Sequence, residues 1–110
     1  EFSLGFKIVV AQKVVAFVMA QQLDTACEIL TLAVAKNFQH QGLATKLLQE
    51  LKNYAKERDW SHIFLEVDSQ NLGAIALYEK FGFVRSGERK NYYVHNNGSR
   101  TSAVLMQFNL

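Results

Sequence analysis

Residues 39–44 read Gln-His-Gln-Gly-Leu-Ala, and they separate an apolar, strand-like run from a strongly amphipathic helical pattern. The first turn of a helix has backbone N–H groups without intrahelical partners, and the aligned peptide dipoles add partial positive charge there. A pyrophosphate can bind at such a place without a lysine or a metal ion. Alternatively, Gly42 only begins a helix after a loop, and the hexapeptide alone favours this plainer interpretation because short glycine patterns often occur by chance.

The helix that follows the loop is predicted from the spacing of its apolar residues. They recur every three to four positions, while polar and charged side chains fill the other side. These apolar residues are Leu43, Leu47, Leu48, Leu51, Tyr54 and Ala55. A second helix is predicted to begin after Asn71, a good N-cap residue, and to end at Gly82, since glycine often terminates helices.

Six stretches have the composition of β-strands, because they are rich in β-branched, aromatic and other apolar residues. They are Leu4–Val10, Val14–Ala20, Cys27–Val34, Ile63–Val67, a stretch from Phe83 onward, and Ala103–Phe108. With the two helices, the predicted order is β-β-β-α-β-α-β-β. This order predicts a mixed α/β fold in which helices flank a mostly antiparallel sheet.

Composition limits the protein to one small domain, which we assign to residues 1–110. Hydrophobic residues make up 49% and charged residues 20%, which excludes wholesale disorder. The apolar stretches are shorter than a membrane span, and no signal segment opens the chain. Cys27 is the only cysteine, so no internal disulfide can form, and we expect a cytoplasmic protein without a membrane partner.

Nucleic acid and metal ions are not expected partners. The net charge of +2 is too small to indicate nucleic-acid binding, and the basic residues between Arg85 and Arg100 fit a solvated hairpin equally well. His40 and His62 have no partner at metal-ligand spacing, and a single cysteine does not supply a zinc site. The sequence therefore predicts no metal site.

Three polar residues downstream are candidates for chemistry. Glu66 interrupts an apolar strand, so its carboxylate either faces solvent or lines a cleft, where it could act as a general base. Asn71 and Tyr78 are seven residues apart, which is two helical turns, so they face the same way. Asn71 is also explained as a helix cap and Tyr78 as a core aromatic. A phenol, which ionises near pH 10, could instead protonate a departing thiolate.

The order and spacing of these segments resemble the GNAT superfamily of acetyl-CoA-dependent N-acetyltransferases. The similar segments are Leu32-Ala33-Val34, Gln39-x-x-Gly42-x-Ala44, Leu65-Glu66-Val67 and Asn71-x-x-Ala74-x-x-Leu77-Tyr78-Glu79-x-Phe81-Gly82-Phe83. The segment Arg89-Lys90-Asn91-Tyr92-Tyr93 further resembles the RimI-like branch, whose members acetylate the N-terminal alanine of a small-subunit ribosomal protein. The likeness extends from Val14 to Phe108.

The resemblance implies a role for each matching residue. The strand residues Leu32, Ala33 and Val34 would bind the acetyl and pantetheine parts of acetyl-CoA. The pyrophosphate would be held by Gln39, His40, Gln41, Gly42, Leu43, Ala44 and Thr45. Asn71 would hydrogen-bond the cofactor near its reactive end, Glu66 would be the general base, and Tyr78 would be the general acid. The amine would attack the thioester directly, so no covalent acyl-enzyme is implied.

The resemblance also implies an acetyl donor and an acceptor. Acetyl-CoA would be the donor, and the partner would be a protein N-terminus, in the first place that of a ribosomal protein. The superfamily usually begins with a strand and one or two helices that wall the acceptor cleft. We find no counterpart before Phe6, so an N-terminally incomplete GNAT domain is expected.

Three alternatives stay open at this stage. The chain could be a GNAT enzyme that acts on lysine or on a small-molecule amine, because the fold alone does not choose the acceptor. It could be an acyl-CoA-binding module without turnover. An RNA-binding domain is the third alternative, and it would require steep salt dependence of RNA binding.

Overall fold

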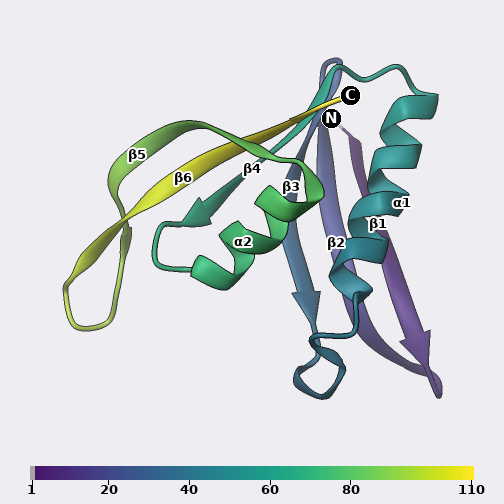
Figure 1. The fold of residues 1–110 in the computed structure, drawn as a ribbon, viewed down its shortest axis with the longest axis horizontal. Helices are drawn as coiled ribbons and strands as arrows, with labels where there is room; N and C mark the ends of the chain where they lie inside the picture. Colours follow the sequence, from purple (N-terminus) through teal and green to yellow (C-terminus); the bar gives the residue numbers. More distant parts are fainter. Residues whose placement is uncertain (1) are drawn as a thin grey trace. The chain divides into compact units, whose positions relative to one another are not determined.

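The computed structural model describes residues 2–110 and confirms the predicted order of strands and helices (Figure 1). The strands are β1 (Phe2–Val10), β2 (Lys13–Leu23), β3 (Ala26–Val34), β4 (His62–Asp68), β5 (Val84–Val94) and β6 (Arg100–Asn109). The α-helices are α1 (Leu43–Glu57) and α2 (Leu72–Phe81), and a short 3-10 helix, η1 (Lys36–Phe38), follows β3. The sequence did not predict η1, and the predicted strands Val14–Ala20 and Ala103–Phe108 are shorter than β2 and β6.

The chain divides into two compact units. The first unit runs to Ile63 and includes Leu110, and the second spans Phe64–Asn109. Neither α1 nor α2 is long and apolar enough to span a bilayer, and these are the only α-helices in the described part of the chain.

In the first unit, three antiparallel strands in the order β1-β2-β3 pack against α1 (Figure 1). Phe6 pairs with Val18 across β1 and β2, and its ring meets the edge of Tyr54 on α1 at 5.7 Å between centroids. The α1 side chains Leu47, Leu48 and Leu51 are buried, as the amphipathic spacing predicts. Burial of this apolar face holds the helix against the three strands.

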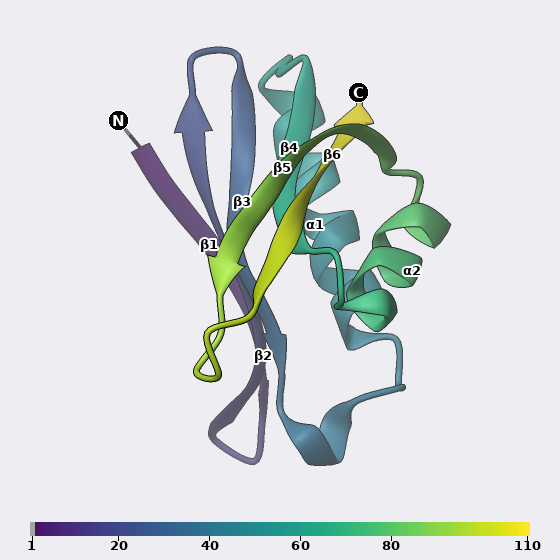
Figure 2. The same ribbon diagram turned by 90° about the vertical axis from the view of Figure 1, so that its left-hand side faces the viewer.

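In the second unit, the strand order is β4-β6-β5, and β5 and β6 form one long antiparallel hairpin (Figure 2). Side chains alternate along β4, so Leu65 and Val67 are buried while Glu66 and Asp68 occupy the other, partly exposed face. Tyr78 of α2 packs edge-on against Phe83 at 5.5 Å between ring centroids. The alternation therefore sets Glu66 apart from the apolar core of this unit.

Candidate functional site

The loop between β3 and α1 is folded back onto the end of β3. The side-chain amide of Gln39 donates a hydrogen bond to the backbone carbonyl of Val34 at 3.1 Å. Gln41 donates in the same manner to the carbonyl of Asn37 at 3.4 Å. Two groups of predicted cofactor residues, the strand residues and the loop residues, are thus brought together within the first unit.

The start of α1 has the geometry of an open anion site. Gly42 is the N-cap residue and has φ +80°, a left-handed conformation that glycine adopts without steric penalty. A Cβ built at Gly42 would meet no atom within 4 Å, so the space beside its backbone is open. No side chain in the described part of the chain caps this helix. The backbone N–H groups of the first turn can therefore receive an anionic ligand.

Leu32, Ala33 and Val34 form the end of β3 and are half-buried. They pair with Val18, Phe17 and Ala16 of β2, respectively. His40 also has a left-handed backbone, with φ +62°, and its side chain is exposed like those of Gln39 and Gln41. Leu43 and Ala44 are half-buried in the first turn of α1, and Thr45 is exposed.

Glu66, the predicted base, forms an ion pair with a residue that the sequence did not connect to it. Its Oε1 atom lies 3.2 Å from Nη2 of Arg89 on β5. The Glu66 side chain is 19% exposed and that of Arg89 is 55% exposed. The Glu66 side chain is therefore mostly shielded from water. The neighbouring Arg89 cation offsets the free-energy cost of burying the negative charge.

Asp68 is a second carboxylate on the same face of β4, two residues after Glu66. The backbone N–H of Gln70, at 3.0 Å, is the largest influence and lowers the pKa of Asp68. Desolvation opposes this effect, while the Thr101 hydroxyl and then His95 lower the pKa further. His95 lies 3.5 Å from Asp68 and 2.8 Å from the Thr101 hydroxyl. Sequence reasoning missed Asp68, although strand alternation placed it beside Glu66.

Tyr93, at the end of β5, has a pKa that both carboxylates influence. Burial is the main cause that raises the pKa of its phenol, and the negative charges of Glu66 and Asp68 raise it further. The neighbouring Tyr92 is 49% exposed and meets the Tyr93 ring edge-on at 5.1 Å between centroids. Tyr92 is also close to this group, because the guanidinium carbon of Arg89 lies 5.4 Å from the centroid of its ring.

On α2, the structure confirms the structural roles predicted for Asn71 and Tyr78. The Asn71 side-chain oxygen accepts a hydrogen bond from the Ala74 backbone N–H at 3.2 Å and so caps the helix. Tyr78 is 7% exposed, and burial raises the pKa of its phenol. A phenol in this environment stays protonated at neutral pH, as a proton donor must. The catalytic and cofactor roles of these two residues stay predictions.

Cys27 and His62 both belong to the first unit. The Cys27 side chain is fully buried on β3, where it is a small core residue. His62 contacts the Ser61 hydroxyl at 2.9 Å through its Nδ1 atom. Within residues 2–110, no three His, Cys, Asp or Glu side chains are arranged to hold a metal ion.

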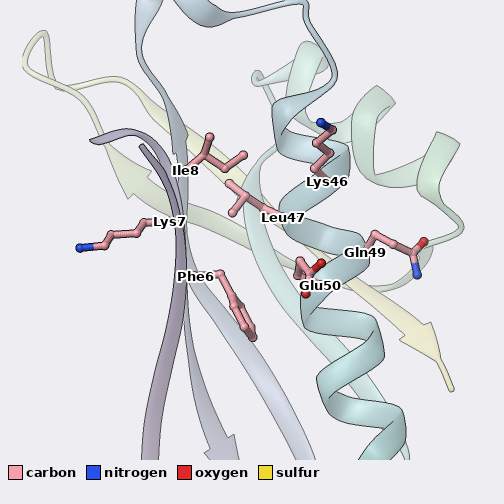
Figure 3. A pocket seen from close by; sticks show the side chains of 7 residues that line it. All are labelled: Phe6, Lys7, Ile8, Lys46, Leu47, Gln49 and Glu50. Carbon is pink, nitrogen blue, oxygen red and sulfur yellow. The ribbon is translucent and has the colours of Figure 1, made fainter. Parts of the chain in front are cut away.

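A pocket of about 560 Å³ lies between β1 and α1 in the first unit. Figure 3 shows Phe6, Ile8 and Leu47 directed toward one another, whereas Lys7 points away from the helix. None of the predicted cofactor residues lines this pocket. It is therefore separate from the loop at Gly42.

Comparison with known proteins gives consistent matches. Residues 2–83 match the model of the acetyltransferase (GNAT) family. The chain is 40% identical to ribosomal protein bS18-alanine N-acetyltransferase of Haemophilus ducreyi, over 94% of this chain and 71% of the relative. It is 35% identical to the enzyme of the same name from Escherichia coli K12, over 94% of this chain and 69% of the relative.

Solved structures confirm the predicted fold. The crystal structure of the Escherichia coli ribosomal-protein-S18-alanine N-acetyltransferase superposes with a TM-score of 0.90 at 34% identity, covering 97% of this chain and 68% of that one. A GNAT family acetyltransferase from Elizabethkingia anophelis, solved with acetyl-CoA bound, has a TM-score of 0.85 at 23% identity. It covers 96% of this chain and 75% of the other, and at this identity it supports the fold alone.

Proposed function

The chain belongs to the GNAT family of acetyltransferases, and on this basis we propose that it transfers the acetyl group of acetyl-CoA to the N-terminal alanine of a ribosomal protein. The proposed acceptor is supported by the similarity to two enzymes named for bS18-alanine N-acetylation, which match 94% of the chain. The fold alone would not choose an acceptor.

The donor side of the proposal rests on the β3–α1 loop. The uncapped first turn of α1 and the open space beside Gly42 fit a pyrophosphate, because backbone N–H groups and the helix dipole favour an anion there. The end of β3, from Leu32 to Val34, would bind the pantetheine and acetyl parts through its backbone. The hydrogen bond from Gln39 to Val34 supports this grouping.

The chemical step proposed is direct attack of the acceptor amine on the thioester carbonyl carbon. Glu66 takes a proton from the acceptor ammonium, so that the free amine can form the new C–N bond. The C–S bond then breaks, and Tyr78 donates its proton to the departing thiolate. The nitrogen loses its extra proton as it becomes an amide nitrogen, and a proton taken up through solvent restores the Tyr78 phenol. Two features support these roles: Glu66 is a mostly buried carboxylate, and burial of Tyr78 raises the pKa of the phenol and so keeps it protonated.

The acceptor is tested by mass spectrometry of peptides incubated with the protein and acetyl-CoA. The panel contains a peptide with a free N-terminal alanine, a lysine peptide with a blocked N-terminus, and a small amine. We expect acetylation of the free N-terminal alanine only. Transfer to lysine or to the small amine would overturn the acceptor. Acetyl-CoA binding without any product would favour a non-catalytic acyl-CoA-binding module.

The two residue roles are tested by Glu66→Gln and Tyr78→Phe. Loss of either proton-transfer group should lower turnover by roughly a hundredfold or more, because general acid–base catalysis typically contributes about 10²–10⁴. Acetyl-CoA affinity, measured by calorimetry, should stay close to that of the unmodified protein. Near-normal turnover in both variants would overturn the assigned roles.

A further inference from the structure

The pairing of β5 with β6 is interrupted between Arg89 and Tyr93. Arg89 lies opposite Ala103 and Tyr93 opposite Thr101, so the five residues 89–93 lie opposite only the three residues 101–103 of β6. Asn91, in the middle, has φ +54°, and its carbonyl accepts a hydrogen bond from Arg100 at 3.4 Å. This irregularity is a β-bulge, which bends a strand and redirects its side chains.

Arg89 and Tyr93 lie on one face of the hairpin, at the two ends of this irregular segment. Their partners on β6 are two residues apart, and residues two apart in a strand project to the same side. Glu66 interacts with both residues. Nη2 of Arg89 lies 3.2 Å from its Oε1 atom, and, in addition to burial, its negative charge raises the pKa of Tyr93. The residues at the two ends of the irregular segment of β5 thus both interact with the Glu66 carboxylate.

We propose that Arg89 is a positioning residue, whose guanidinium holds the Glu66 carboxylate in the orientation from which it accepts the proton of the acceptor amine. The inference rests on the proposed function, since it requires Glu66 to be the base. A glutamate side chain has three rotatable bonds, and an ion pair with the Arg89 guanidinium at 3.2 Å restricts them. Misplacement of a reacting group by about 1 Å can reduce the rate by roughly 10²-fold.

The Arg89–Glu66 pair differs from an ordinary surface ion pair on the same strand. Arg85 lies 3.8 Å from Glu79, and both of these side chains are more than half exposed. Exposed pairs of this kind contribute little, because water and salt screen them. In the Arg89 pair the carboxylate is only 19% exposed and the distance is 3.2 Å. Arg85 therefore offers a matched control for Arg89.

The first test is steady-state kinetics of Arg89→Met, Arg89→Lys and the control Arg85→Met on a peptide with an N-terminal alanine. We expect Arg89→Met to lower kcat roughly tenfold, within the range that misplacement of a reacting group explains. KM for acetyl-CoA should not change. Arg89→Lys should recover most of kcat, since it restores a cation, and Arg85→Met should stay within about twofold of the unmodified protein.

A double-mutant cycle shows whether Arg89 acts through Glu66. In the Glu66→Gln background, Arg89→Met should cause no further loss of kcat, because the carboxylate that it positions is gone. An equal loss in both backgrounds would overturn the inference, as would an unchanged kcat in Arg89→Met alone. Thermal unfolding and acetyl-CoA affinity of each variant show whether it is folded, and Arg89→Gln replaces Arg89→Met if the latter is not.

The outcomes also separate this inference from the proposed function. If Glu66→Gln abolishes turnover while Arg89→Met does not change it, only the positioning role is overturned. If Glu66→Gln keeps full turnover, Glu66 is not the base, and the proposed mechanism and the role of Arg89 are overturned together.

Discussion

The Gln39 side chain donates a hydrogen bond to the Val34 carbonyl at 3.1 Å, and this contact ties the start of the β3–α1 loop to the end of β3. Residues predicted for two different parts of the cofactor are thereby held in one arrangement. The contact that holds the loop needs no charged side chain, because it joins the side-chain amide of Gln39 to a backbone carbonyl.

The first prediction concerns this hydrogen bond. Gln39→Met keeps the side-chain length and removes the donor, and a typical hydrogen bond contributes about 1 kcal/mol. We expect acetyl-CoA to bind roughly fivefold more weakly by calorimetry, with kcat retained at saturating acetyl-CoA. The matched control is Gln49→Met, which removes an exposed hydrogen bond to Asn53 on α1. Equal affinities of the two variants would contradict the role of the loop contact.

The second prediction separates backbone strain from ligand contact at Gly42. Gly42 has φ +80° and Gly98 has φ +83°, and a Cβ at either position would meet no atom within 4 Å. Alanine at each position should therefore cost a similar free energy of unfolding, about 1 kcal/mol, in urea titrations. Only Gly42→Ala should weaken acetyl-CoA binding, because its methyl group enters the space proposed for the pyrophosphate. Unchanged affinity in Gly42→Ala would place the pyrophosphate elsewhere.

The third prediction distinguishes the two roles of Asn71. Asn71→Asp keeps an oxygen for the Ala74 N–H and adds a negative charge at the helix N-terminus, so stability should be maintained. Asn71→Ala removes the cap and should lower the free energy of unfolding by about 1 kcal/mol. Both variants should bind acetyl-CoA more weakly if the Asn71 amide donates to the cofactor. If Asn71→Asp binds acetyl-CoA with undiminished affinity, Asn71 caps the helix but does not bind the cofactor.

The fourth prediction concerns acid stability. The Gln70 backbone N–H, followed by Thr101 and His95, lowers the pKa of Asp68 below its ordinary value of 3.8. The ionised carboxylate therefore stabilises the folded state above this value, and the stabilisation is lost as the pH falls through the lowered pKa. In urea titrations between about pH 6 and pH 3, the free energy of unfolding should fall more steeply for the unmodified protein than for Asp68→Asn. Parallel curves would exclude this contribution.

The fifth prediction concerns Cys27. Burial raises the pKa of its thiol to about 12, and the side chain is fully buried. A thiol reagent should therefore leave the folded protein unmodified near neutral pH and react promptly in denaturant. Because the acetyl group is proposed to pass directly to the amine, Cys27→Ala should retain turnover. A folded Cys27→Ala variant without turnover would instead indicate a covalent intermediate.

Local patterns in the sequence were sufficient for the order of the elements and for several of their ends. The three-to-four spacing from Leu43 to Ala55 predicted α1, and Asn71 and Gly82 marked the two ends of α2. These features depend on backbone propensities and on the periodicity of neighbouring residues, so they can be recognised without any long-range contact. Gly42 was a correct marker of the α1 start for the same reason.

The partners of the candidate base depended on long-range pairing. Arg89 of β5 forms an ion pair with Glu66 of β4, and the polar group of Asp68, His95 and Thr101 joins residues from β4, β6 and the connecting turn. No local pattern specifies which positions face each other across strands, and a single bulge shifts the register of every residue that follows it. The sequence by itself therefore determined the elements and the family resemblance, whereas the surroundings of Glu66 were determined by strand register in the folded chain.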